Sequence, residues 1–413
     1  MNPASPRVDP RASPTGDVWL TFARSHLGKN LVSEGAFEGL REIGQQLPGT
    51  ALGAIEARLV GAGDRVDYSV RLDPQAMLRV VPRLPPSPLT ELATAWAEAD
   101  PRFEPLSALW LEFDQKQAPG PGAPGPGVSD AEGPVPETGA PQLPNPVVCA
   151  QLRGRPSTGW IVDTLVPALQ GHGMGAERRR QVASRLEALP EGAKPLYVFA
   201  LTPRPGSPTR IETYGLAPRD MVAYLRRSVS QGAARQVEEI LPLVEDGERH
   251  HLSVDLLDEG PSPRIGVEVS FAGLPHREPG WRRLFDRLVA AGLCSPEHRE
   301  AVFAWPGQDR PETAPERWPG GAPGPVRGHA VRCLSHVKLV TRPDHPPEAK
   351  VYLLIQHLPT VAGSPRASGK RRALAPDAAP SGGGAKAEVG GQLRGTVDEE
   401  RDPELFKGRP DLL

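Results

Sequence analysis

Cysteine is scarce in this sequence, and the three that occur are far apart, at Cys149, Cys294 and Cys333. Zinc sites and disulfide frameworks use closely spaced cysteines, so we expect neither, and we predict three reduced core thiols. Long apolar runs are also missing, because no stretch reaches the roughly 18 apolar residues that a spanning helix needs. The first residues have no basic start followed by an apolar segment. The sequence therefore predicts a cytoplasmic protein that does not enter a membrane.

Neither sign of charge is in excess. Lysine and arginine number 48 against 50 aspartates and glutamates, which gives a net charge of -2 at pH 7. A chain with this balance has no general field that would attract nucleic acid or an anionic membrane surface. Any function based on charge must therefore be local, and we expect no nucleic acid partner.

Proline and glycine are abundant, at 50 and 44 residues, and they gather in a few segments. Residues 1–16 and 362–413 are polar or rich in Gly, Ala, Pro and charge, which predicts two disordered ends. Residues 115–146 and 306–328 are Pro/Gly-rich runs without a helical or strand period, which predicts two insertions. The remainder, 17–361, is predicted to form a single barrel domain.

Between these segments, pairs of strand-like runs recur across short turn-rich loops. The five predicted hairpins pair 52–60 with 66–72, 108–114 with 147–153, 196–202 with 210–216, 251–256 with 264–271, and 336–342 with 350–356. Between successive hairpins the apolar period becomes helical, usually twice. The apolar positions Trp281, Leu284, Phe285, Leu288 and Val289 mark one buried helix face, for example.

Repeated units of this kind predict an α+β fold in which five hairpins, or ten antiparallel strands, close into one barrel surrounded by helix pairs. Closure removes edge strands, and ten strands leave room for a ligand in the lumen. An α+β protein of two domains with no lumen would also alternate hairpins and helices, so this alternative stays open.

Along the strands one set of alternate positions is apolar and the other is polar. Helices on one face of a sheet cover its apolar set, so we expect positions such as Ile55 and Leu353 to face outward and the polar set to face the lumen. The polar set comprises Glu56, Arg58, Asp67, Ser69, Arg71, Trp110, Glu112, Asp114, Gln151, Arg153, Glu212, Tyr214, His251, Ser253, Asp255, Arg264, Glu268, Ser270, His336, Lys338, Arg342, Lys350, Tyr352 and Gln356.

This order of elements, from about residue 37 to 358, resembles the prenyltransferase barrel of the aromatic prenyltransferases. The most specific local match is Lys350-Val351-Tyr352, which is similar to the alternating Lys-x-Tyr pattern that those enzymes place against a diphosphate. The resemblance implies transfer of an allylic prenyl group from a diphosphate co-substrate to an aromatic small molecule or a peptide side chain, in secondary metabolism. It also implies a glutamate base on an early strand, for which Glu56 is the first choice and Glu112 the second.

Prenyl transfer needs cations for the diphosphate and aromatic faces for the allylic cation. The predicted diphosphate contacts are Arg58, Arg71, Arg153, Arg264, Lys338 and Lys350. The predicted rings are Trp110, Tyr214 and Tyr352, with Gln356 as a further substrate contact. Tyr197 also falls on a predicted strand, and Tyr68 lies on the outward face. The six cations could instead pair with Glu56, Asp67, Glu212 and Glu268 as a structural network.

No Asp-rich metal motif or Gly-rich phosphate loop occurs, so we predict no metal site and no required cofactor, although Mg²⁺ could still assist a diphosphate donor. Prenyl transfer is the first choice, and a second function stays open as the alternative. A non-catalytic barrel of the same architecture could bind a peptide or partner protein in a biosynthetic pathway, and the low content of aromatic residues, 5%, favours this reading.

Overall fold

The computed structural model describes residues 15–49, 52–114, 143–310 and 328–359. Ten antiparallel strands form one closed ring in the order β1 to β8, β10, β11 and back to β1. The closed ten-stranded barrel predicted from the sequence is therefore confirmed, and the alternative without a lumen is wrong. The predicted disordered ends and the insertion at 115–146 lie almost entirely outside the described residues.

The ten ring strands follow the predicted hairpins closely. They are β1 (Leu52–Arg58), β2 (Val66–Leu72), β3 (Leu106–Asp114), β4 (Val147–Leu152), β5 (Lys194–Ala200), β6 (Thr209–Tyr214), β7 (Arg249–Leu257), β8 (Gly260–Ser270), β10 (Gly328–Arg342) and β11 (His345–Pro359). In each of the five hairpins the two strands are neighbouring and antiparallel, so the first strand ends and the second begins at the same end of the barrel, which we call the turn end. The connections to helices lie at the other end, the helix end.

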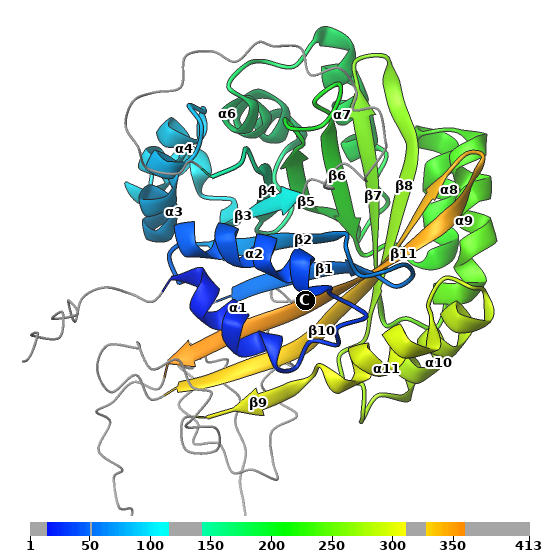
Figure 1. Cartoon of the computed structure of the whole chain (residues 1–413). Coiled ribbons are helices and arrows are strands. Elements are labelled where there is room, and N and C mark those ends of the chain that lie inside the picture. Colours follow the sequence, from blue (N-terminus) through cyan, green and yellow to red (C-terminus); the bar gives the residue numbers. More distant parts are fainter. Residues whose placement is uncertain (1–14, 50–51, 115–142, 311–327, 360–413) are drawn as a thin grey trace, which may run out of the picture.

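Helices surround the barrel on its outer face (Figure 1). They are α1 (Gly16–Arg24), α2 (Glu34–Gln46), α3 (Pro74–Val80), α4 (Leu89–Ala97), α5 (Thr158–Trp160), α6 (Val166–Gln170), α7 (Ala176–Glu187), α8 (Pro218–Ser228), α9 (Gln231–Val244), α10 (Pro279–Ala290) and α11 (Pro296–Ala304). Short turns of other helix type occur at Val81–Arg83, Pro101–Phe103 and Ile161–Leu165. No helix among the described residues is long and apolar enough to cross a membrane.

The main hydrophobic core lies between the barrel wall and these helices. Outward strand positions such as Ile55 and Leu353 are fully buried in it, and Tyr68 is buried on the same face, as predicted. Helix α10 shows why the local sequence suits this arrangement. Pro279 occupies its first turn, the Glu278 side chain accepts a hydrogen bond from the Gly280 amide, and the apolar stripe that begins at Trp281 packs inward.

Three local predictions need correction. Strands β10 and β11 continue for 15 residues each, well beyond the predicted hairpin, and turn at Pro343 and Asp344, where Asp344 has a φ of 59°. A short strand, β9 (Gly307–Asp309), pairs with β10 inside the run 306–328 that shows no strand period in the sequence. Helix α1 was not predicted and begins at Gly16, within the segment predicted to be disordered.

Candidate functional site

The polar strand positions face the lumen, as predicted, and part of that lumen is a central cavity of about 90 Å³. The cavity is small because side chains fill much of the interior. Six rings contribute to its wall, from β3, β5, β7, β10 and β11: Trp110, Tyr197, Phe199, His251, His336 and Tyr352. Its ionisable lining residues are Glu112, Cys149, Arg210, Glu212, His251, Glu268 and Lys338, together with Tyr197, His336 and Tyr352.

The rings around the cavity are packed against one another. His336 stacks on Tyr352 with 4.0 Å between ring centroids and 25° between planes, and Tyr197 lies 6.1 Å from Phe199. Trp110 donates a hydrogen bond from Nε1 to Gln151 Oε1 over 3.3 Å. Tyr197 was predicted on a strand but not as a site residue, and Phe199 was not predicted as a lumen residue, because β5 is apolar on both faces and shows no alternation.

Glu56 is the centre of a buried group of charges on β1 and β11. It accepts hydrogen bonds from Lys350 Nζ, over 2.6 Å, and from the Tyr352 hydroxyl, while Arg58 Nη1 lies 3.4 Å away. Burial alone would raise the pKa of Glu56, but the charges of Lys350 and Arg58 hold it well below its usual range. The carboxylate is therefore ionised and already engaged, and it does not line the central cavity.

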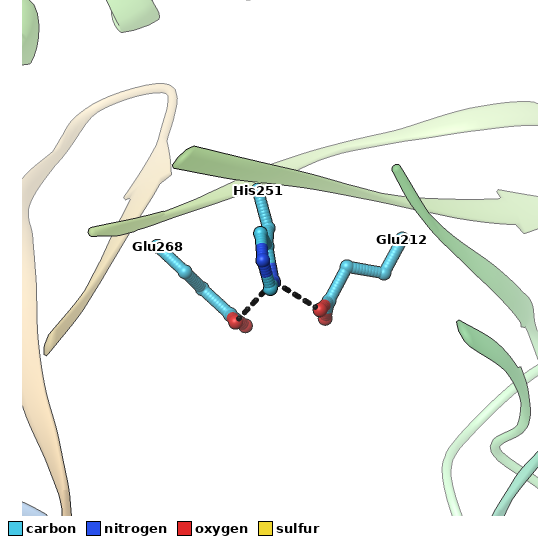
Figure 2. A group of neighbouring side chains, drawn as sticks. All are labelled: Glu212, His251 and Glu268. Carbon is cyan, nitrogen blue, oxygen red and sulfur yellow. Dashed lines mark hydrogen bonds and ion pairs between the residues drawn. The ribbon is translucent and has the colours of Figure 1, made fainter. Parts of the chain in front are cut away.

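A second buried group lies at mid-lumen, where His251 on β7 stands between Glu212 on β6 and Glu268 on β8 (Figure 2). His251 Nδ1 lies 3.0 Å from Glu212 Oε1 and 3.5 Å from Glu268 Oε2. Lys338 Nζ lies 2.6 Å from Glu268 Oε1 and 3.9 Å from Glu212 Oε2. Burial would lower the pKa of His251, but the two carboxylates raise it to about 9, so the imidazole carries a proton at neutral pH.

One ligand atom from each of Glu212, His251 and Glu268 lies within 4.8 Å of the others, a spacing that could hold a metal ion. The ammonium group of Lys338 and the protonated ring of His251 already balance the two carboxylates, however. A divalent cation would have to displace the proton of His251 and approach Lys338. We therefore treat the group as an ion-pair network, and no step below depends on a metal.

The turn end opens on a third group of charges around a cavity of about 660 Å³. Arg204, on the β5–β6 loop, lies 2.7 Å from Glu112 and 3.0 Å from Asp114, and Arg210 Nε lies 2.5 Å from Asp255 Oδ1. Arg264 also contacts Asp255, at 3.4 Å. Neither Arg204 nor Arg210 was predicted from the sequence as a site residue. Arg210 lies two positions before Glu212 on β6 and therefore faces the lumen as Glu212 does.

The six cations predicted to bind one diphosphate do not form one site. Arg58, Arg264 and Lys350 line the turn-end cavity, Lys338 lies at mid-lumen, and Arg71 and Arg153 line a cavity at the helix end. Arg71 is four residues along β2 from Asp67, the partner of Arg58, which at about 3.3 Å per residue is roughly 13 Å. The turn-end and mid-lumen cations all have carboxylate partners, which is the structural network that the sequence left open.

The remaining predicted site residues also lie at different depths of the lumen, between the turn end and the helix end. Glu112, Trp110 and Tyr352 line the central cavity, whereas Tyr214 lines the helix-end cavity. Gln356 pairs with Leu52 across the barrel seam and does not line the central cavity. The central cavity thus brings together a carboxylate and several rings, which are the groups needed to remove a proton and to shield a carbocation.

No family model matches the chain, and no curated protein matches it. The chain is similar to the solved apo structure of prenyltransferase PriB at 13% identity, over 82% of this chain and 94% of that one, with a TM-score of 0.42. It is similar to 5-dimethylallyltryptophan synthase from Streptomyces coelicolor at 14% identity, over 83% and 97%, with a TM-score of 0.43. At these identities and TM-scores, we assign roles to lumen residues only from the geometry of this chain.

Replacing Lys350 with Met should lower the free energy of unfolding by about 3–5 kcal/mol, because it leaves the buried carboxylate of Glu56 without its nearest cation. Adding Glu56→Gln to Lys350→Met should recover most of that loss, since both charges are then gone. Urea denaturation of the wild type, both single variants and the double variant measures the coupling. Additive losses would show that the two side chains do not stabilise each other.

The protonated His251 should make stability depend on pH. Its pKa of about 9 lies above the ordinary value of 6.5, so its contribution is fully present below pH 6.5 and is lost as the pH rises through about 9. We expect the urea midpoint to fall over this interval in the wild type and to fall less in His251→Gln. Parallel decreases in the two proteins would mean that His251 is neutral in the folded state.

Proposed function

We propose that this chain transfers an allylic prenyl group from a diphosphate donor to an aromatic small molecule or a peptide side chain. The observation that carries the proposal is the central cavity, where six rings and three buried carboxylates, among them Glu112, line one space inside the barrel. Rings stabilise a carbocation through their quadrupoles without attacking it, and a closed barrel keeps water away from it. Both properties suit a reaction that passes through an allylic cation. They do not suit hydrolysis, which needs water at the reacting carbon.

In this reaction the bond between the allylic carbon and the diphosphate oxygen breaks, and its electron pair leaves with the diphosphate. A bond then forms between the allylic carbon and the acceptor, which loses a proton to a base. The electrons and atoms balance without an oxidant or a reductant. The barrel has to provide a ring-lined space for the cation, a base, and a positively charged place for the leaving group.

Glu112 suits the base better than Glu56, the first choice from the sequence. Burial raises the pKa of Glu112, the nearby Arg204 opposes that increase, and the charge of Glu56 adds to it. A carboxylate with a raised pKa accepts a proton more readily near neutral pH. Glu56, in contrast, is held by Lys350 and Tyr352, so its role in this proposal is to orient the Tyr352 ring at the cavity wall.

A second candidate is a non-catalytic barrel that binds a peptide or partner protein. The pairing of Lys350 with Glu56 and of Lys338 with Glu268 favours it, because each ammonium group is neutralised before any donor arrives. The small size of the central cavity also favours it. Binding of a prenyl diphosphate distinguishes the two functions.

We expect one of the non-hydrolysable thiolodiphosphate analogues of dimethylallyl, geranyl or farnesyl diphosphate to bind saturably to the purified chain. A ligand at a hundred times its dissociation constant adds about 2.7 kcal/mol to stability, which raises the melting temperature measurably. Thermal shift and calorimetric titration, each with and without Mg²⁺, measure the effect. A folded protein that binds none of the three analogues would instead support the non-catalytic function.

Glu112→Gln should lower turnover by about 10²–10⁴-fold, because the amide cannot accept the acceptor's proton. Asp114→Asn is a matched control, since Asp114 also contacts Arg204 but does not line the central cavity. With a panel of aromatic acceptors and the donor that binds, the control should keep turnover within a few fold of the wild type. Equal losses in the two variants would assign the effect to the Arg204 contact and not to a base.

A further inference from the structure

The loop between β5 and β6 brings Arg204 to the proposed base. It runs from Leu201 to Pro208, and the Leu201 amide donates a hydrogen bond to the Pro208 carbonyl over 3.0 Å. Nη2 of Arg204 lies 2.7 Å from Oε1 of Glu112. The same guanidinium contacts Asp114, with Nε 3.1 Å and Nη2 3.0 Å from its carboxylate oxygens. The position of the loop therefore decides how close this cation lies to Glu112.

The backbone of this loop is strained. Ser207 has a φ of 40°, in the left-handed region that residues other than glycine rarely adopt, and Gly206 before it has a φ of 72°. Such conformations persist where surrounding contacts enforce them. Pro203, Pro205 and Pro208 have no amide proton, so the loop has few backbone donors with which to hold itself. The turn at Ser207 therefore depends on contacts from outside the loop.

Arg178 of helix α7, outside the barrel, provides such a contact (Figure 1). Its Nη1 donates a hydrogen bond to the Ser207 carbonyl over 2.8 Å, and its Nη2 donates one to the Gly206 carbonyl over 3.2 Å. Nη2 also lies 3.0 Å from Asp258, in the β7–β8 turn. Arg178 is only 5% exposed. A planar, buried guanidinium that donates to successive carbonyls fixes both the position and the direction of the turn.

Glu112 is surrounded by charged and titratable groups from several elements. Burial raises its pKa, Arg204 is the first influence that opposes the increase, and Glu56 adds to it. The groups that face it are Arg204, Glu56, Asp67, Asp114, Cys149, Arg210 and Tyr352. Of these, Arg204 lies on a loop, and the others lie on strands of the barrel. A displaced loop would therefore remove one cation from Glu112 and leave the other groups in place.

We propose that Arg178 is a positioning residue for the proposed base, because it holds the β5–β6 loop at the turn end so that Arg204 stays on Glu112. Arg178 lines neither the central cavity nor the turn-end cavity, so its effect on Glu112 passes through the loop. The catalytic importance of this arrangement rests on the function proposed above, whereas the control of the charge of Glu112 by the loop does not.

The titration of Glu112 can be measured directly by carbon-13 NMR of protein labelled at the glutamate carboxyl carbons, with Glu112→Gln to assign its signal. Arg204→Met removes the cation that contacts this carboxylate, so it should raise the titration midpoint by about 1–3 pH units. Arg178→Met should raise the midpoint by about one unit, the lower end of that range. In the Arg204→Met background, Arg178→Met should raise it no further, since the loop then carries no charge to misplace.

Arg185→Met is the matched control. Arg185 is as buried as Arg178 on the same helix, but its guanidinium donates to the Gln181 carbonyl of that helix. Glu112 should titrate in this variant as in the wild type. If Arg178→Met does not fold, Arg178→Lys keeps the charge without the planar fork and should give a smaller rise. An unchanged midpoint in the variant that folds, an equal rise in Arg185→Met, or a further rise in the double variant would overturn the positioning role.

The pH dependence of prenyl transfer separates this role from the proposed function. In the wild type, kcat/KM should fall as the pH decreases through the midpoint of Glu112, and in Arg178→Met the fall should begin about one pH unit higher. A raised midpoint in a protein that transfers no prenyl group would support the positioning role and contradict the proposed function. Prenyl transfer with an unchanged midpoint and pH profile in Arg178→Met would do the reverse.

Discussion

The pairing of β1 with β11 closes the barrel, and every property of the lumen depends on it. Seven residue pairs form this seam, from Leu52 opposite Gln356 to Arg58 opposite Lys350. The seam joins residues almost 300 positions apart in the chain and removes the two edges that an open sheet would expose. Because the sheet is closed, its polar face surrounds a confined interior in place of bulk water. Charges on that face must find partners or bind ligands.

The charged side chains of the lumen do not all have partners of opposite charge among the described residues. Near the turn end and at mid-lumen, several cations lie beside carboxylates contributed by neighbouring strands, as Lys338 does with Glu268 and Arg210 with Asp255. Desolvation makes each such charge costly alone, so the pairs form a network whose members depend on one another. At the helix end, Arg71, Arg153 and Lys194 have no carboxylate partner among the described residues.

The central cavity differs from both ends, because rings form much of its wall. His336 and Tyr352 are stacked there, and the hydroxyl of Tyr352 is anchored on Glu56. The Glu56–Lys350 pair thus links the stability of the seam to the orientation of a cavity ring. Glu112, with a pKa raised by burial, faces the same space from β3. The same strands therefore supply the barrel's closure and the chemical groups of its interior.

The amino-acid sequence alone determined the hairpin order, the closed barrel and which alternate positions face inward. These features follow from local alternation, since a strand with Glu56 and Arg58 on one face and Ile55 on the other has one stable orientation beneath covering helices. The sequence did not indicate the inward positions where alternation is absent, as on β5, where Phe199 lies among apolar neighbours. Only the tertiary structure decided which charges pair, because Lys350 meets Glu56, and Lys338 meets Glu268, through strand contacts that no local pattern records. For that reason the six predicted cations, alike in sequence, are divided between paired and uncompensated ends of one lumen.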